Sequence, residues 1–447
     1  MSEQESTLDE FVSDSVDSSS QKSEKKLRKL VEKDAAGVWG DEPNGDGVKV
    51  LRATNYGENT IDLSDVAVRD IPESKRTSKK LEPGDIIVER SGGSADQPVG
   101  RVLFFNLEGE YYHGNFLRQL RPKASEINSR YLYYYLDYDY KRGGTKPLQT
   151  NTTNIRNLQY SSYLNQNIPV KPLSEQRKIA TVLYTVDQAI EKTEEIIEQF
   201  RTIKNGTIHQ FLSGGITHAE YRGARIGPKK VRIPSEWAIK RISEIADIKN
   251  GNRIIPGHEY ADGRTEFPFI RISDMEDGTV STEDIKYLKK ETASQMNRGI
   301  IGSNDVFITV TGRVGDAGIV PEELDGARFT DNAAKLYNFE GVTNEYLSLY
   351  LRSKFGKDEV HRFTVGSNQP KLSMYRVEKM EVLVPSIEEQ KQIVEKISSI
   401  QECIKSNEKV ERWLRSIKQG LMQDLLSGTV RTTDTNITVP DEVAQHG

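Results

Sequence analysis

Two polar stretches of the chain carry side chains whose hydrogen-bonding groups suit the edges of nucleobases and phosphates. Primary amides pair with adenine through two hydrogen bonds, guanidinium groups do the same with guanine, and lysine suits phosphates. Most of these side chains lie in residues 143–158 and 364–373. The candidates are Lys146, Gln149, Asn151, Asn154, Arg156, Asn368, Gln369 and Lys371, together with Arg313 in the sequence TGRVG. Because asparagine and glutamine also favour turns, a purely structural role stays open for each of them.

The rest of the chain offers no pattern suited to catalysis. It contains no Walker A motif and no two adjacent prolines, which excludes the Asn/Asp-Pro-Pro-aromatic signature of amino-methyltransferases. A single cysteine, Cys403, and six scattered histidines argue against a structural zinc site. The histidines show no arrangement expected of a Ser-His-Asp triad. We therefore predict no catalytic centre, no bound metal and no cofactor on this chain.

The net charge of −5 comes from one end of the chain. Residues 1–25 hold seven acidic and two basic residues, so the remainder is neutral overall. This serine-rich, acidic segment predicts a disordered tail, and an acidic pI therefore does not argue against a nucleic-acid partner. The sequence has no run of 18 apolar residues and no basic leader followed by an apolar segment. These features exclude a membrane-spanning helix and favour the cytoplasm.

An internal repeat organises the sequence. Residues 173–214 align without a gap with residues 387–428, and 12 of the 42 positions are identical, among them a Glu-Gln pair and the closing Leu-Ser-Gly. Both copies place apolar residues alternately four and three positions apart, the period of a coiled-coil helix. The predicted seam consists of Ile179, Leu183, Val186 and Ile190, continuing to Ile203, and of Ile393, Ile397, Ile400 and Ile404, continuing through Val410 to Ile417.

Each copy predicts a long helix of about 58 Å. We expect the two helices to pack on each other, with the seam residues of the first copy facing their counterparts 214 positions later. Ser386 and Glu389 predict a capping box at the start of the second helix. The alternative, in which each helix completes the core of its own domain, stays open.

The segments before the two helices share a layout but few residues. Each contains an Asp before an apolar strand that ends in a glycine-rich loop, PGDIIVERSGG or SNDVFITVTGRVG. Each continues to a tyrosine-rich helix, RYLYYYL or EYLSLYL, and then to one of the polar stretches. We expect these tyrosines to pack in the core. Two modules with one layout and different residues indicate two related tasks with different specificities.

A basic stretch lies between the first long helix and the second module. Residues 217–241 contain seven basic and two acidic residues. A linker of this composition could follow a phosphate backbone or simply be solvated, and both interpretations stay open.

With this tandem layout and these motifs, the chain resembles the DNA-specificity subunit of type I restriction–modification enzymes. The motifs are PLSEQRKI from Pro172, PSIEEQKQI from Pro385, GSNQPKL from Gly366, RYLYYYL from Arg130 and the two Leu-Ser-Gly ends. Ser367 joins the candidate contact residues through GSNQPKL. The first polar stretch lacks a sequence of the type GSNQ, so the resemblance supports a contact role for its residues less directly.

The resemblance implies an α+β fold: two pseudo-repeated mixed α/β target recognition domains separated by an antiparallel coiled coil of two long helices. Each domain would read one half of a split double-stranded DNA sequence, and the coiled coil would set the spacing. The implied partners are two methyltransferase subunits, which bind S-adenosylmethionine and methylate adenine, and two restriction (translocase) subunits, which use ATP and Mg²⁺. The specificity subunit itself would have no activity.

The predicted division of the chain follows the repeat. It comprises an acidic tail (1–34), a first recognition domain (35–171), a first spacer helix (172–214), a basic linker (215–231), a second recognition domain (232–384), a second spacer helix (385–428) and a C-terminal tail (429–447). Two other functions stay open, a stand-alone bipartite DNA-binding regulator and a coiled-coil interaction scaffold with no role on DNA.

Overall fold

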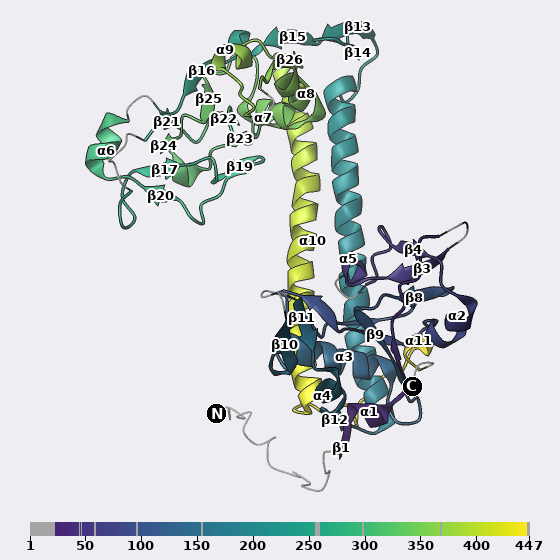
Figure 1. The fold of residues 1–447 in the computed structure, drawn as a ribbon. Helices are drawn as coiled ribbons and strands as arrows, with labels where there is room; N and C mark the ends of the chain where they lie inside the picture. Colours follow the sequence, from purple (N-terminus) through teal and green to yellow (C-terminus); the bar gives the residue numbers. More distant parts are fainter. Residues whose placement is uncertain are drawn as a thin grey trace, which may run out of the picture. The chain divides into compact units, whose positions relative to one another are not determined.

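The chain forms two compact units, which we call unit 1 (residues 1–194 and 410–447) and unit 2 (residues 195–409). The computed structural model describes residues 23–43, 45, 47–57, 60–94, 97–152, 155–254, 260–296, 299–366 and 369–444, except for the side chains of residues 151 and 152. Figure 1 shows the elements of both units. Within the described residues, no helix is both long and apolar enough to span a membrane.

Each unit is built on a four-stranded antiparallel sheet, and the two sheets have equivalent strand orders. In unit 1 the order is β2 (Val31–Ala36), β9 (Leu117–Pro122), β5 (Ile86–Glu89) and β7 (Val102–Phe104). In unit 2 it is β16 (Asp247–Asn250), β25 (Ala333–Tyr337), β22 (Val306–Thr309) and β23 (Ala317–Ile319). Every residue of β5 and β22 is buried, which explains why both strands are continuous rather than alternating apolar runs.

The Asp that precedes each of these strands forms an ion pair with a neighbouring strand. Asp85 is fully buried and receives hydrogen bonds from the guanidinium of Arg121 on β9, with its nearer oxygen 2.8 Å from Nε. Asp305 lies 2.8 Å from the ammonium of Lys335 on β25. The motif shared by the two modules therefore holds neighbouring strands together, which makes this Asp a structural residue.

The tyrosine-rich segments form α3 (Ser129–Lys141) and α7 (Asn344–Arg352). Asn128 and Thr343 cap these helices, because their side-chain oxygens accept hydrogen bonds from backbone N–H groups of the first turn. The hydroxyls of Tyr131 and Tyr346 donate to equivalent carbonyls, those of Pro169 and Leu383, at 3.0 and 2.8 Å. Both rings are fully buried, so the prediction that these tyrosines pack in the core is confirmed.

Smaller elements complete the units. In unit 1 these are β1 (Ser23–Lys26) paired with β12 (Asn167–Val170), the sheet β4 (Ala67–Arg69), β3 (Val48–Leu51) and β8 (Tyr111–His113), the sheet β10 (Gln149–Thr152), β11 (Ile155–Leu158) and β6 (Ser91–Gly93), and helices α1 (Leu27–Leu30), α2 (Glu73–Lys79), α4 (Tyr160–Leu164) and α11 (Asp441–Ala444).

Unit 2 has its own set of smaller elements. They are β15 (Ala238–Arg241) paired with β26 (Glu381–Val384), β13 (Tyr221–Ile226) with β14 (Lys229–Pro234), β18 (Met275–Glu276) with β19 (Thr279–Val280), the sheet β20 (Lys286–Tyr287), β17 (Pro268–Ile270), β24 (Ala327–Phe329) and β21 (Ile300–Ile301), and helices α6 (Lys290–Gln295), α8 (Lys354–Phe363) and α9 (Met374–Val377).

The repeat forms two long helices, α5 (Leu173–Gly214) and α10 (Ile387–Ser427), and each unit contains one part of both. Within each unit the two helices run antiparallel, because partners advance along α5 as they recede along α10. The pairs are Asp187–Lys418 (2.5 Å) and Glu194–Arg415 (2.5 Å) in unit 1, and Arg201–Glu408 (2.9 Å) and Lys204–Gln401 (2.8 Å) in unit 2. The predicted pairing of the two long helices is confirmed.

The prediction that seam residues face their counterparts 214 positions later is wrong. In an antiparallel pair the start of one helix meets the end of the other. Ile179 and Leu183 accordingly lie in the core of unit 1 with Leu425, and Ile393 and Ile397 lie in the core of unit 2 with Leu212. Val186 and Ile190 likewise belong to unit 1, whereas Ile400 and Ile404 belong to unit 2.

The helices pair with each other, and each also completes the core of a domain; the two interpretations hold for different parts of the helices. The cluster around Ile179 and Leu183 includes Tyr131 and Tyr134, and that around Ile393 includes Tyr346, so the helix starts complete the domain cores. The predicted seam fails further along, since Ile203 is 51% and Val410 42% exposed.

The repeated glutamine binds the backbone that begins each tyrosine-rich helix. The side-chain oxygen of Gln176 accepts from the backbone N–H of Asn128 (2.8 Å) and its amide nitrogen donates to the carbonyl of Lys171 (2.7 Å). Gln390 accepts from the N–H of Thr343 (2.8 Å) and donates to the carbonyls of Gly341 and Pro385, both at 3.0 Å. Both glutamines are fully buried. We call them the glutamine latches.

The repeated glutamate binds the segment that follows the other long helix. Glu175 accepts two hydrogen bonds from Arg431, at 2.7 and 2.8 Å. Glu389 accepts from the indole N–H of Trp237 (2.9 Å) and the backbone N–H of Ile216 (3.1 Å), and lies 2.7 Å from Nε2 of His218. With its carboxylate engaged there, Glu389 does not reciprocate the bond that Ser386 accepts from its N–H, so the predicted capping box is only half formed.

Three predicted boundaries need correction. Residues 23–34, assigned to the tail, form β1, α1 and part of β2, with Leu27 and Leu30 fully buried; residues 1–22 lie outside the description. The predicted linker 215–231 contributes to the β13–β14 hairpin. The predicted C-terminal tail packs on unit 1, where Val443 is buried and accepts a hydrogen bond from Asn128. In each case, a few apolar side chains in a polar segment provide enough burial to order it.

Candidate nucleic-acid interface

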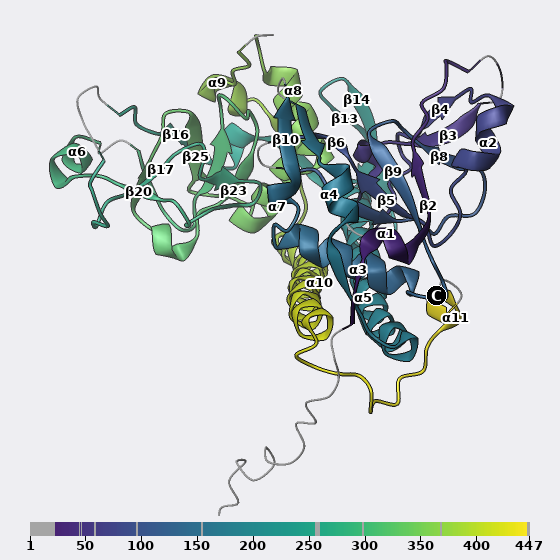
Figure 2. The same ribbon diagram turned by 60° about the horizontal axis from the view of Figure 1, so that its bottom comes forward.

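In unit 1 the first polar stretch is paired with the glycine-rich loop that follows the central strand. β11 lies between β10 and β6, so that Arg156 is opposite Gly93 and Asn157 opposite Ser91, whose hydroxyl donates to the Asn157 side chain at 2.7 Å. Figure 2 shows β10 and β6 at one edge of the unit 1 domain. The expected loop is therefore largely a β-hairpin, and the backbone orients its alternate side chains to opposite faces.

The predicted contact residues of unit 1 occupy this hairpin and the turn before it. Lys146 is exposed in the short 3₁₀ helix Lys146–Leu148. Gln149 is half-buried; its amide nitrogen donates to the carbonyl of Thr145 (3.4 Å) and its oxygen accepts from Arg156 (3.5 Å). Asn151 is opposite Arg156 in the register, although its side chain is not described, and Asn154 lies outside the described residues.

Unit 2 repeats this arrangement with different residues. Lys371 forms antiparallel β-bridges with Thr311, in the TGRVG loop, and with Val365. The N–H of Leu372 donates to the carbonyl of Val310 at 2.9 Å. Gln369 and Lys371 are exposed; Ser367 and Asn368 lie outside the described residues. In both units, then, the loop after the central strand and the polar stretch come together, although more than 50 residues separate them in the sequence.

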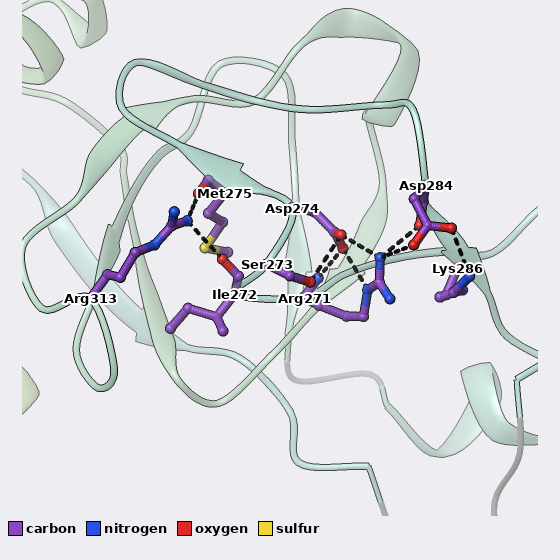
Figure 3. Close-up of polar contacts among 8 residues, drawn as sticks. All are labelled: Arg271, Ile272, Ser273, Asp274, Met275, Asp284, Lys286 and Arg313. Atoms are coloured by element: carbon purple, nitrogen blue, oxygen red, sulfur yellow. Dashed lines mark hydrogen bonds and ion pairs between the residues drawn. The ribbon is translucent and has the colours of Figure 1, made fainter. Parts of the chain in front are cut away.

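Arg313 has a bracing role within unit 2. Its guanidinium donates to the carbonyls of Ile272 (3.1 Å) and Met275 (Figure 3). Its Nε also lies 3.3 Å from Asp316. The side chain is still 56% exposed. Arg313 therefore ties the TGRVG loop to the turn at residues 272–275, and its remaining donors stay accessible.

The turn that Arg313 holds is itself fixed by ion pairs. Arg271 donates two hydrogen bonds to Asp274, at 2.5 and 3.0 Å, and also reaches Asp284, which binds Lys286 (Figure 3). The hydrogen bond to Asp274 raises the pKa of Arg271. The turn that binds Arg313 is therefore held by a network of charged side chains, which no sequence motif predicted.

Sequence patterns also missed two exposed aromatic side chains beside these surfaces. Phe116 is 57% exposed, and its carbonyl accepts from the N–H groups of Arg90 and Ser91 at the start of β6. With Trp39, Ala53 and Leu117 it lines a largely apolar hollow of about 410 Å³. In unit 2, Tyr375 is 63% exposed and carries the Lys379 ammonium 4.0 Å from its ring centre. Single exposed aromatics have no periodicity, so only the structure identifies them.

The comparisons with known proteins agree with this architecture. Residues 43–200 and 234–414 match the family described as "Type I restriction modification DNA specificity domain". The chain is 24% identical over 371 residues to the type I restriction enzyme MjaVIII specificity subunit of Methanocaldococcus jannaschii, covering 81% of this chain and 83% of that protein. It is 25% identical over 378 residues to the EcoKI specificity subunit of Escherichia coli, covering 79% and 75%.

Solved structures show the same fold. The S subunit of the type I restriction–modification system from M. genitalium superposes with a TM-score of 0.53 at 15% identity, covering 92% of this chain and 97% of that one. A chain from a study of "complex assembly" and "conformational transition of the type I R-M system" gives 0.55 at 14% identity, covering 91% and 98%. Because the family model matches residues in both modules, this chain belongs to the specificity subunits of type I restriction–modification enzymes.

Proposed function

We propose that this specificity subunit reads a bipartite double-stranded DNA site, one half with each globular domain. The observation that carries the proposal is the duplicated surface: in both units the loop after the central strand of an equivalent four-stranded sheet pairs with a polar stretch, but the exposed residues differ. A conserved scaffold with different surface side chains suits two readers of different half-sequences, because base edges are distinguished by side-chain donors and acceptors.

In this proposal the long helices determine the distance between the half-sites. Half-sites about one helical turn apart, roughly 34–36 Å, present themselves on one face of DNA. The bases between them would be spanned and not read.

The chain would act as the DNA-recognising part of a larger enzyme. We propose that it recruits two methyltransferase subunits, which bind S-adenosylmethionine and methylate adenine, and two restriction subunits, which use ATP and Mg²⁺ to translocate. The chain would itself contribute neither a catalytic centre nor a cofactor site. Failure to purify with a methyltransferase would instead support the stand-alone regulator, and weak, salt-insensitive DNA binding would support the scaffold.

The first test maps methylated adenines in cells with and without the gene. We expect a single split motif that disappears with the gene. The double variant Gln369→Ala, Lys371→Ala should relax one half of this motif, and Gln149→Ala, Arg156→Ala should relax the other half. The result that contradicts the proposal is a contiguous motif, or loss of both halves in each variant while the protein remains folded.

The second test changes the length of the helices. Inserting one heptad into α5 after Glu194 and one into α10 after Lys409 adds about 10 Å to each helix. Paired insertions preserve the antiparallel packing, whereas a single insertion should misalign it and serves as the control. We expect the preferred spacer of the motif to lengthen by about three base pairs, since base pairs rise about 3.4 Å. An unchanged spacer with full activity would rule out the helices as the measure of distance.

A further inference from the structure

The β13–β14 hairpin of unit 2 is a two-stranded ribbon with an unusual charge. Its strands carry Arg222, Arg225, Lys229, Lys230 and Arg232 and no acidic residue. Figure 1 shows it as a narrow ribbon following α5. In unit 1, the described residues that follow α10 form no such ribbon, and the cation there, Arg431, is bound by Glu175.

One face of the ribbon packs on unit 2, and the cations of that face are used within the unit. The register alternates side chains, so that Arg222, Ile226, Lys229 and Ile233 share a face. Ile226 and Ile233 are buried in the core. Arg222 donates to the carbonyl of Trp237 at 2.7 Å, and Lys229 pairs with Asp358 on α8. This face therefore packs against the core of unit 2, and both of its cations have partners within the unit.

The other face carries the remaining three cations. Arg225 is directly opposite Lys230, and Arg232 is opposite Gly223; all three cations are exposed. Arg232 lies over the ring of Tyr221, 5.0 Å from its centre. In the described part of the chain, Arg225 and Lys230 form no ion pair, and like charges directly opposite each other destabilise a strand pair. Such a face gains stability when an anion binds to it.

The shape and composition of this face fit the phosphates of a duplex. A two-stranded ribbon matches the width of a DNA groove, and guanidinium groups bind phosphate oxygens in pairs. A Cβ added at Gly223 would meet nothing within 4 Å, so a backbone can approach closely there. None of the large exposed apolar side chains lies in residues 221–234, whereas the centre of a protein–protein interface is apolar.

We propose that Arg225, Lys230 and Arg232 bind the phosphate backbone of double-stranded DNA without reading its sequence. The identity of the partner rests on the proposed function. The ribbon adds affinity outside the two reading surfaces, and it does so only from unit 2.

The test compares two triple variants of the full-length chain. Arg225→Gln, Lys230→Gln, Arg232→Gln removes the three ribbon cations, and Lys290→Gln, Lys396→Gln, Lys405→Gln removes three exposed lysines elsewhere in unit 2. Binding is measured for a duplex with the mapped site and for a scrambled duplex, between 50 and 200 mM salt. A charge-preserving variant, Arg225→Lys, Lys230→Arg, Arg232→Lys, controls for folding.

We expect the ribbon variant to bind both duplexes more weakly by the same factor, on the order of tenfold to a hundredfold at 0.1 M salt. The slope of log affinity against log salt should fall by about 0.9 for each lost phosphate contact. The lysine control and the charge-preserving variant should keep the slope of the unmodified chain.

Three outcomes overturn the proposal. An unchanged slope excludes phosphate contacts. Loss on the mapped site alone means that the ribbon reads sequence. Normal DNA binding with loss of a partner subunit assigns the ribbon to a protein interface. If the unmodified chain does not prefer the mapped site, the proposed function fails, but the slopes on the scrambled duplex still decide the role of the ribbon.

Discussion

Unit 1 contains the start of α5 and unit 2 contains the start of α10, and a repeated glutamine and glutamate bind the neighbouring chain at each start. The glutamine makes equivalent contacts in the two units, whereas the glutamate makes different ones. The glutamine latches bind the same backbone groups in both units, namely the N–H of the capping residue and nearby carbonyls. The neighbouring glutamates differ: Glu175 binds an arginine, and Glu389 binds a tryptophan, a histidine and a backbone N–H. The contacts of the glutamines to backbone groups are thus shared by the two halves, whereas the contacts of the glutamates differ.

The ion pairs formed by Asp85 and Asp305 should show the largest difference in stability between the units. Arg121→Met leaves the fully buried Asp85 without its cation, and removing one partner of a buried pair costs about 3–5 kcal/mol. Lys335→Met should cost less, about 1–3 kcal/mol, because Asp305 and Lys335 both retain some contact with solvent. Hydrogen exchange of the amides of β5 and β22 measures each unit separately. Equal losses, or none beyond that of the exposed control Lys75→Met, would contradict this ranking.

The glutamine latches should instead give equal effects. Gln176→Ala and Gln390→Ala each leave buried backbone groups unpaired, at about 1–3 kcal/mol per group, so we expect each to destabilise its unit by about 2–4 kcal/mol. The exposed neighbours Gln188 and Gln392 provide matched alanine controls that should change stability by less than about 0.5 kcal/mol. Urea unfolding monitored by hydrogen exchange tests this. A latch that matters in only one unit would break the equivalence.

Acid should affect unit 1 through His113. Burial, followed by the charges of Lys79 and Arg118, lowers the pKa of His113 to about 3, and both ring nitrogens are buried without a hydrogen-bond partner. The unfolded chain binds a proton near pH 6.5 and the folded chain does not, so stability falls as pH drops below about 6.5. We expect a loss of about 2 kcal/mol between pH 8 and pH 5.

A comparison of variants isolates this contribution of His113. His113→Leu should flatten the pH profile of the melting temperature, and the exposed His209→Gln should leave it unchanged. The same slope in His113→Leu and in the unmodified chain would show that other groups cause the acid sensitivity.

Removing the exposed aromatic side chains Phe116 and Tyr375 should have the smallest effects, and each should affect DNA binding by its own unit. Phe116→Ala should weaken binding at the half-site of unit 1, and Tyr375→Ala at that of unit 2, each by about fivefold or about 1 kcal/mol, because aromatic rings contact thymine methyl groups and base faces. Competition binding with duplexes mutated in one half measures this. Stability should change little, since both rings are exposed. Equal weakening on scrambled duplexes would remove these rings from the reading surface.

Periodicity and repetition predicted the large features of the fold. The 42-residue repeat predicted two long helices that pack together, and the dense tyrosines predicted buried helices, because both signals extend over many residues. The direction of pairing could not be read from the seam, since equal copies fit parallel or antiparallel packing. The resemblance implies the antiparallel arrangement, in which the equivalent seam residues of the two copies lie in different units.

The candidate site was less predictable. The polar stretches were identified by composition, but their pairing with the glycine-rich loops depends on contacts between distant segments. The donors of Arg313 reach carbonyls near residue 272, which no local pattern reveals. In the same way, a few apolar residues such as Leu27, Ile226 and Val443 order segments whose average composition predicted a tail or a linker.

The glutamine latches have a consequence for how the domains are attached. Each glutamine forms hydrogen bonds with main-chain atoms of the capping residue and of the neighbouring segments. These main-chain atoms are present whichever side chains the domain carries. A globular domain can therefore change its surface residues and still be attached in the same way, provided that the long helix beside it begins at the same place. The attachment of each domain to its long helix is thus independent of the side chains on the domain surface.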